Sequence, residues 1–176
     1  TYQKILAEAM EELGLETGLS SKNVRDSYVE DCTIETDQLA LIPDSYIDIT
    51  AEKMRIYKEL DSLTRDEEVD DMARRTEDRF GKMPPELLAL FDIVRIRHLG
   101  EKLGFEKIII KNGIMIAFMI ANQMSPYYRS TEFSRVMESI SKNERLFEFN
   151  TKGGKFRVIS RKVDSIPKAL AVLRKL

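Results

Sequence analysis

Thiol and imidazole side chains, the groups most used for nucleophilic catalysis and structural zinc, are scarce in this 176-residue chain. Cys32 is the only cysteine and His98 the only histidine, so a thiol–imidazole nucleophile would need these two to meet. His98 lies in the middle of a helical pattern, and we do not expect that pairing. Structural zinc normally takes four nitrogen or sulfur ligands, more than these two residues supply. We therefore predict no catalytic residue and no metal site.

The same composition limits where the chain works. A lone cysteine cannot form an internal disulfide, which makes a reducing cytoplasm the expected location. No apolar run approaches the roughly 18–20 residues that a membrane span needs, so we predict no membrane partner.

Two other groups of residues resemble catalytic or binding motifs. Acidic side chains crowd positions 66–71, at the start of a predicted helix, where negative charge complements the helix dipole. An acid/base enzyme built on them remains an alternative that would need a concave pocket over that helix. Gly153 and Gly154 lie between two lysines, but neither common phosphate-binding loop motif is present. We interpret the glycines as a hairpin turn and predict no cofactor for this chain.

The stretch "EDRFGKMPP" at residues 77–85 offers a different kind of chemistry. Val69, Met72 and Phe80 follow a helical apolar stripe, and the three charged residues just before Phe80 point away from it. Three exposed charges on a rigid helix end make a workable docking patch. The predicted partner-binding residues are Asp78, Glu77 and Arg79.

Charge is distributed unevenly along the chain. Residues 61–80 hold eight acids and four bases, a net charge of −4, whereas residues 141–176 hold ten bases and three acids, a net charge of +7. This asymmetry allows a basic face that touches nucleic acid, an acidic surface that docks on a basic partner, or an ordinary solvated surface. The nucleic-acid alternative would use Arg145, Lys152, Lys155, Arg157, Arg161 and Lys162.

The elements that must position these residues predict an α+β fold. Helices fill the first two-thirds, and two hairpins, at Asn112-Gly113 and Gly153-Gly154, build a small antiparallel sheet. A strand is expected over 33–42, ending before Pro43, and Asp44 with Ser45 forms a turn in "LIPDSYI". Thr50 is expected to cap one helix that turns Met54 inward, and Thr64 with Glu67 to form a capping box for the next. Two ion pairs are expected on that helix, Asp70–Arg74 and Asp71–Arg75.

Three segments are predicted. Residues 1–13 carry apolar side chains at helical spacing and form a detached N-terminal helix, residues 14–32 read as a linker, and residues 33–176 form the main domain. Because the chain opens on Thr1 inside a helical pattern, we expect it to be a piece of a longer protein.

In their order, "LIPDSYI", "RIYKEL", "EDRFGKMPPELL" and "DIVRIRHLGEKLGFEKI" resemble a known family. The match spans residues 37–108 and is similar to the C-terminal domain of bacterial transcription-repair coupling factors. Residues 1–13 also resemble the helix that ends the motor module of that family.

The resemblance implies a non-catalytic regulatory domain. In that family the parent is an ATP-driven DNA translocase that uses ATP and Mg in its motor, displaces stalled RNA polymerase from damaged DNA, and recruits the excision-repair lesion scanner. The C-terminal domain packs on an N-terminal repair-helicase-like module and masks the surface that recruits the scanner, as an autoinhibitory clamp. Motif matching carries the family contact onto Asp78, with Glu77 and Arg79 beside it.

Overall fold

The computed structural model of the protein describes residues 28–176. The predicted helix at residues 1–13 and most of the predicted linker at 14–32 lie outside the described residues. Within the described part, no helix is long and apolar enough to cross a membrane.

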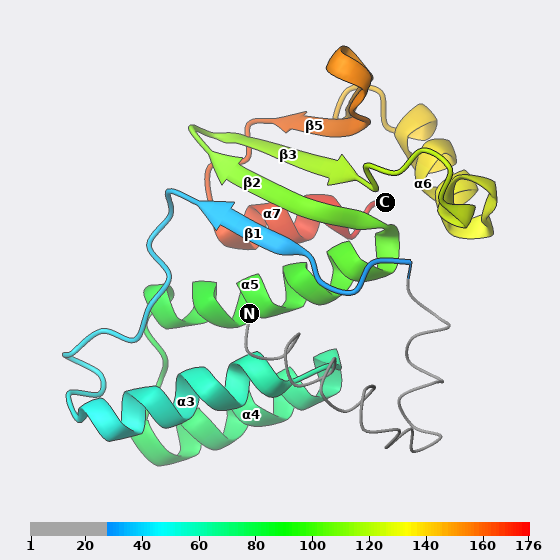
Figure 1. The fold of residues 1–176 in the computed structure, drawn as a ribbon. Coiled ribbons are helices and arrows are strands. Elements are labelled where there is room, and N and C mark those ends of the chain that lie inside the picture. Colours follow the sequence, from blue (N-terminus) through cyan, green and yellow to red (C-terminus); the bar gives the residue numbers. More distant parts are fainter. Residues whose placement is uncertain (1–27) are drawn as a thin grey trace, which may run out of the picture.

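Five strands form one mixed sheet (Figure 1). In the order β1-β2-β3-β5-β4 they are β1 (Thr33–Thr36), β2 (Phe105–Lys111), β3 (Ile114–Met119), β5 (Arg157–Arg161) and β4 (Glu148–Asn150). β1 runs parallel to β2, and every other pair is antiparallel. β1 ends at Thr36, earlier than the expected strand over 33–42. Just beyond it, the Asp37 amide donates to the Ile110 carbonyl at 3.3 Å, and the Asp37 carboxylate accepts a hydrogen bond from the Asn112 amide at 2.9 Å.

Both predicted hairpins are confirmed. Asn112 and Gly113 join β2 to β3 with φ values of 55° and 72°, the left-handed conformation that a tight hairpin turn requires. The second hairpin joins β4 to β5 through a short 3-10 turn, Lys152–Gly154. Its two glycines also have positive φ, which explains their place in the sequence without a phosphate ligand.

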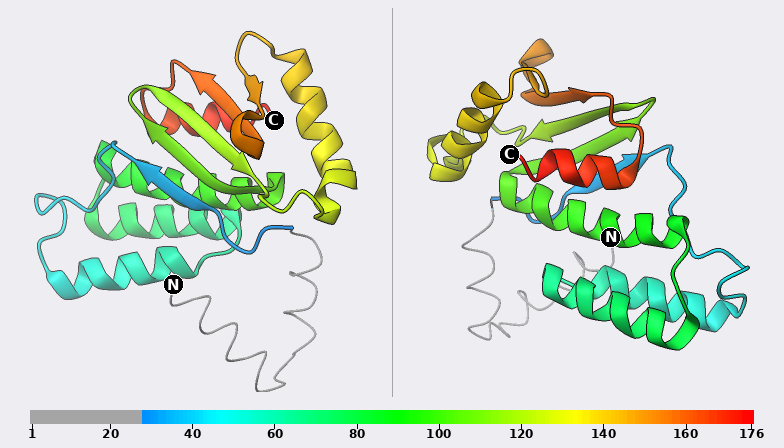
Figure 2. Two further views of the ribbon diagram at one scale, coloured as in Figure 1. Left: turned by 45° about the horizontal axis from the view of Figure 1, so that its top comes forward. Right: turned by 180° about the vertical axis from the view of Figure 1, so that it is seen from behind.

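Among residues 28–176, five α-helices accompany the sheet: α3 (Thr50–Ser62), α4 (Asp66–Phe80), α5 (Pro85–Leu103), α6 (Thr131–Lys142) and α7 (Ile166–Leu173). α5 and α7 lie against one face of the sheet, and α3 and α4 lie on the far side of α5 (Figures 1 and 2). The α+β class is confirmed, and the fold has three layers with α5 in the middle.

The composition of α5 explains its central place. Phe91, Leu87 and Val94 belong to a core shared with α3 and α4, whereas Ala89 and Ile96 belong to the larger core under the sheet. A helix that is apolar over most of its circumference can bury two faces at once. Its ends are set by Pro85 at the first position and by Gly104, with φ 93°, at the C-cap.

Several local predictions for α3 and α4 were wrong. Ile49, not Thr50, occupies the cap position of α3, and Met54 is 49% exposed while Ile56 and Leu60 are buried. The carboxylate that accepts from the Thr64 and Arg65 amides is Glu68, one residue later than expected, because α4 begins at Asp66.

Candidate docking surface

Four segments meet at one end of the helical layer, which we call the α4 end. They are the loop of residues 37–49, the first turn of α3, the last turn of α4 and the first turn of α5 (Figure 1). The Leu41 amide donates to the Glu86 carbonyl at 3.2 Å, and the Tyr46 hydroxyl donates to the Gly81 carbonyl. Gly81 ends α4 with φ 95°. The surface therefore rests on contacts between segments far apart in sequence.

The three predicted docking residues are all exposed, but they differ in what they contact. The Glu77 carboxylate accepts a hydrogen bond from the Met83 amide at 3.0 Å and so fixes the turn after α4. The Arg79 guanidinium bonds to Glu52 at 2.8 Å and lies 4.9 Å from the centre of the Phe80 ring. Asp78 has no hydrogen bond or ion pair to any described residue. Of the three side chains, Asp78 is the one left for an external partner.

Exposed apolar side chains that sequence reasoning missed lie at the same end of the helical layer. Five of the seven large apolar residues that are exposed in the described part belong to the four segments of the α4 end. They are Leu39, Leu41, Ile49, Met54 and Leu88, with Leu39 and Ile49 exposed by 61% and 60%. A cluster of exposed apolar side chains beside charge is typical of protein interfaces. Local pattern gave little signal for them, since helical spacing had predicted that Met54 points inward and the loop residues follow no stripe.

A groove of about 220 Å³ separates α3 from α4 next to this end. Ile56, Met72 and Phe80 line its apolar part, and three arginines line its rim. The Arg55 and Arg79 guanidiniums hold the pKa of the Glu52 carboxyl below its usual range. Because the arginines already have carboxylate partners, the groove is a network of internal ion pairs and offers little unbalanced charge.

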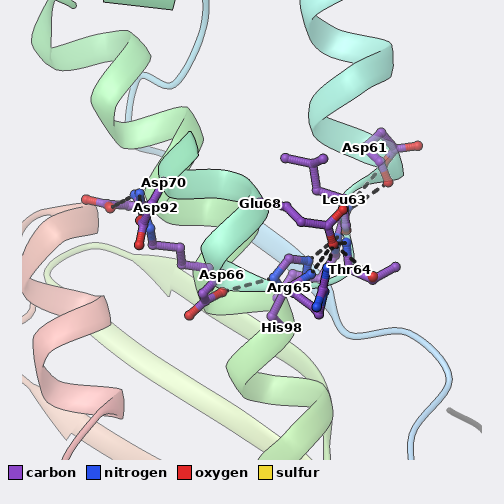
Figure 3. Close-up of polar contacts among 11 residues, drawn as sticks. Asp61, Leu63, Thr64, Arg65, Asp66, Glu68, Asp70, Asp92 and His98 are labelled. Atoms are coloured by element: carbon purple, nitrogen blue, oxygen red, sulfur yellow. Dashed lines mark hydrogen bonds and ion pairs between the residues drawn. The ribbon is translucent and has the colours of Figure 1, made fainter. Parts of the chain in front are cut away.

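Polar bridges to α5 fix the direction of α4 (Figure 3). His98 Nδ1 lies 3.0 Å from the Asp66 carboxylate, and Nε2 lies 2.9 Å from the Leu63 carbonyl. Arg97 bonds to Asp61 at 3.0 Å, at the end of α3. These contacts tie α5 to the α3–α4 junction, and the rigid α4 then carries Asp78 outward at its far end.

A further bridge corrects an expected ion pair. Arg95 bonds to Asp70 at 2.6 Å and to Asp92 at 3.0 Å, so Asp70 does not pair with Arg74. The expected Asp71–Arg75 pair is present at 3.1 Å. The acids of 66–71 thus serve helix packing, because a cation or histidine from α5 reaches across to two of them.

Catalytic and metal chemistry find little support in the described residues. Burial raises the pKa of the Cys32 thiol above its ordinary value, which keeps it neutral, and His98 is engaged with Asp66. No group of three or more potential metal ligands occurs among residues 28–176.

The six basic residues of the nucleic-acid alternative do not form one cluster of free charges. Arg161 pairs with Glu148 at 3.3 Å, and Arg157 is half-buried, with its guanidinium bonded to the Lys152 carbonyl at 3.2 Å. Arg145, Lys152, Lys155 and Lys162 are exposed on the loops around β4 and β5. Nucleic-acid binding stays a prediction.

Comparisons with known proteins agree with the fold. The model of the TRCF domain family matches residues 36–130. The chain is similar to the transcription-repair-coupling factor of Escherichia coli strain K12, with 28% identity over 131 residues, 71% of this chain and 11% of that protein. It is similar to that of Rickettsia bellii, with 36% identity over 87 residues, 49% of this chain and 8% of that protein. The chain spans about a tenth of the length of these relatives.

A solved structure shares the architecture. The crystal structure of the C-terminal domain of a transcription-repair coupling factor superposes with a TM-score of 0.65 and 14% identity, covering 82% of this chain and 88% of that one. At this identity the likeness concerns the fold.

Proposed function

The chain belongs to the TRCF domain family, and on that premise we propose that it is a regulatory domain with no reaction of its own. It docks through the α4 end onto an N-terminal repair-helicase-like module of the same protein. Docking masks the surface that recruits the excision-repair lesion scanner. The parent protein works in the cytoplasm, where it displaces stalled RNA polymerase from damaged DNA and binds ATP and Mg in its motor, outside this domain.

One observation carries the proposal: Asp78 is exposed and has no partner among the described residues, while its neighbours Glu77 and Arg79 are tied to the domain itself. A carboxylate held on a rigid helix end costs little ordering entropy when a partner cation approaches. The exposed apolar side chains of the α4 end supply area that water leaves on docking. The partner surface should therefore be basic and partly apolar.

The ion pairs of the groove support the assignment of roles. Charges that pair within the domain fix its shape, whereas a free charge at the rim of an apolar surface governs orientation and choice of partner. Glu77 and Arg79 accordingly act as positioning residues, and Asp78 makes the contact.

The test is charge reversal in the full-length protein. Asp78→Arg would place like charge against a basic partner, open the clamp and increase the apparent affinity for the lesion scanner by about tenfold, which corresponds to about 1.4 kcal/mol. Glu144→Arg makes the same charge change at an exposed position far from α4, and it should leave scanner binding unchanged. Binding is measured by pull-down and by titration with purified scanner.

If Asp78→Arg bound the scanner no better than the wild type while remaining folded, this helix would not be the clamp. If Glu144→Arg had the same effect, total charge and not position would be responsible, which also overturns the assignment. Ile49→Ser removes an exposed apolar side chain from the same surface, and like Asp78→Arg it should increase the apparent affinity for the scanner.

A further inference from the structure

The outward face of the sheet carries a regular pattern that the docking function does not use. The strand register places Ile116 at its centre, with Ile109 on β2 and Ile159 on β5 directly opposite it. Along β3, Ile114 and Phe118 lie two residues away on the same side, because side chains alternate between faces of a strand. The five residues therefore form an apolar cross.

Four cations occupy the corners of this cross. Lys107 and Arg157 flank Phe118, and Lys111 and Arg161 flank Ile114, each as the direct cross-strand neighbour. We call the five apolar residues and these four cations the outer sheet face. The same register that makes the hairpins thus fixes an apolar centre with a basic frame.

No described helix lies over this face. α5 and α7 both lie against the opposite side of the sheet, and α6 lies beside it (Figures 1 and 2). The five apolar side chains are only partly buried, and they belong to none of the core clusters of the described residues. A sheet with one helix-covered face and one bare face of partly apolar character can accept a partner.

The ion pairs at the edges leave a surplus of positive charge. Glu35 on β1 lies 3.0 Å from Lys107 and 3.7 Å from Lys111, and Glu148 on β4 lies 3.3 Å from Arg161. Two carboxylates thus face four cations. Arg157 has no carboxylate partner among the described residues, and its Nε is buried without a hydrogen-bond partner. An incoming acidic group would complete this frame.

The pattern disfavours a second copy of the chain. Both sides of the central row Ile109–Ile116–Ile159 are basic, so two outer sheet faces packed together would set cations against cations in either orientation. Like charges juxtaposed across an interface oppose association.

The pattern also disfavours single-stranded nucleic acid. Sequence-tolerant binding of single strands uses open aromatic rings as stacking platforms, often several in a row. Here the centre is aliphatic, and the single ring, Phe118, already has the Arg157 guanidinium 5.5 Å from its centre.

We propose that the outer sheet face binds an amphipathic helix of a protein partner, lying along β3, with acidic residues on both sides of its apolar stripe. The Lys column on β2 and the Arg column on β5 are two strand spacings apart, about 10 Å, which matches the roughly 10–12 Å width of a helix. The apolar column from Ile114 to Phe118 is about 13 Å long, enough for about nine helical residues. The site is separate from the α4 end.

The probe is a labelled helical peptide of about 18 residues with leucines at i, i+3, i+4 and i+7 and glutamates on both flanks. Fluorescence anisotropy with the 176-residue chain at low salt should show binding of this peptide and not of a matched peptide with lysine in place of glutamate. Ile116→Glu should weaken binding by more than about tenfold, and Ile116→Ala by a smaller factor. The double variant Lys107→Glu/Arg157→Glu should reverse the preference between the two peptides.

Asp78→Arg, at the α4 end, should leave peptide binding unchanged, which keeps this test independent of the clamp. Urea unfolding of each variant shows that it is folded, and Ile116→Ala, which adds no charge, is the variant least able to disturb the sheet. Equal binding of the two peptides, or binding of neither, would overturn the proposal. Binding of a single-stranded DNA oligonucleotide in place of the acidic peptide would overturn it in favour of nucleic acid.

Discussion

Where α3 and α4 meet α5, charged side chains bridge the helices around a shared apolar core, whereas the contact between α5 and the sheet is apolar throughout. Arg95, Arg97 and His98 reach from α5 to acids of the helical layer. Under the sheet, fully buried residues such as Ile108 and Phe105 pack against α5 and α7 instead. The strength of a polar bridge depends on the direction of its hydrogen bonds and on pH. The strength of apolar packing depends on how well the side-chain shapes fit. The two regions should therefore respond to different perturbations.

The difference suits the two surfaces. α4 must hold Asp78 at a defined angle, and directional hydrogen bonds to α5 do this with a small core. The register of the sheet is held by the backbone hydrogen bonds between strands and by the apolar core on its helix-covered face. The side chains of the outer sheet face are therefore not needed for the core. Each of the following changes affects one region and spares the other.

The largest effect should come from the glycine at the sheet end of α5. A Cβ on Gly104 would lie 2.2 Å from the Tyr127 ring, which is fully buried, and the residue has φ 93°. Gly104→Ala should lower the free energy of unfolding by more than about 3 kcal/mol, from overpacking added to backbone strain. Chemical denaturation measures the loss.

Gly81 at the α4 end is the matched control. Its φ is 95°, but no atom lies within 4 Å of a Cβ built there, so Gly81→Ala should cost only the backbone strain, about 1–3 kcal/mol. If the two variants were equally destabilised, close packing at Tyr127 would not be what distinguishes the two helix ends.

A smaller effect is expected at the polar bridge. His98→Ala removes the contacts to Asp66 and the Leu63 carbonyl and should cost about 1–2 kcal/mol. Amide hydrogen exchange should accelerate in α4 while β2 and β3 remain protected, because the bridge holds only the helical layer. Lys142→Ala, which breaks an exposed ion pair with Glu138, should change little. Uniform acceleration in both layers would contradict the division.

A pH dependence of stability is expected at the C-terminal half of α5. Burial raises the pKa of the Glu101 carboxyl from its ordinary value of 4.5 to about 7. Between these values the native state binds more protons than the unfolded chain, so stability falls as pH rises through this range. Glu101→Gln removes the titrating group, and its unfolding midpoint should change less than that of the wild type between pH 4.5 and 7.5. Parallel profiles would mean that other groups set the dependence.

Features fixed by neighbouring residues could be predicted from sequence. Asn112-Gly113 adopts the positive φ values of a tight turn, as expected. Gly81 and Gly104 end their helices, and Pro85 begins α5. These outcomes depend on backbone conformations that few other residue types adopt. The predicted helix starts were wrong by one residue. Ile49 takes the cap position of α3 in place of Thr50, and Glu68 takes the capping role expected of Glu67.

Choices between distant partners could not be predicted. Arg74 was a plausible ion-pair partner for Asp70 on the same helix, but Asp70 pairs with Arg95 from α5. Exposed ion pairs within one helix contribute too little energy to determine which partner a carboxylate takes. The exposed side chains of the α4 end belong to four separate segments, so no local pattern shows them together.

The sequence by itself determined the elements, their turns and the family, because periodicity, positive φ and motif order are properties of short stretches of chain. Only the tertiary structure decided which charge is free and which face is bare. In the sequence, Glu77, Asp78 and Arg79 are three adjacent charged residues with nothing to separate their roles. Folding brings the Met83 amide to Glu77 and the Glu52 carboxylate to Arg79, and so engages these two. The basic frame around Ile116 likewise exists only once β2, β3 and β5 have paired in register.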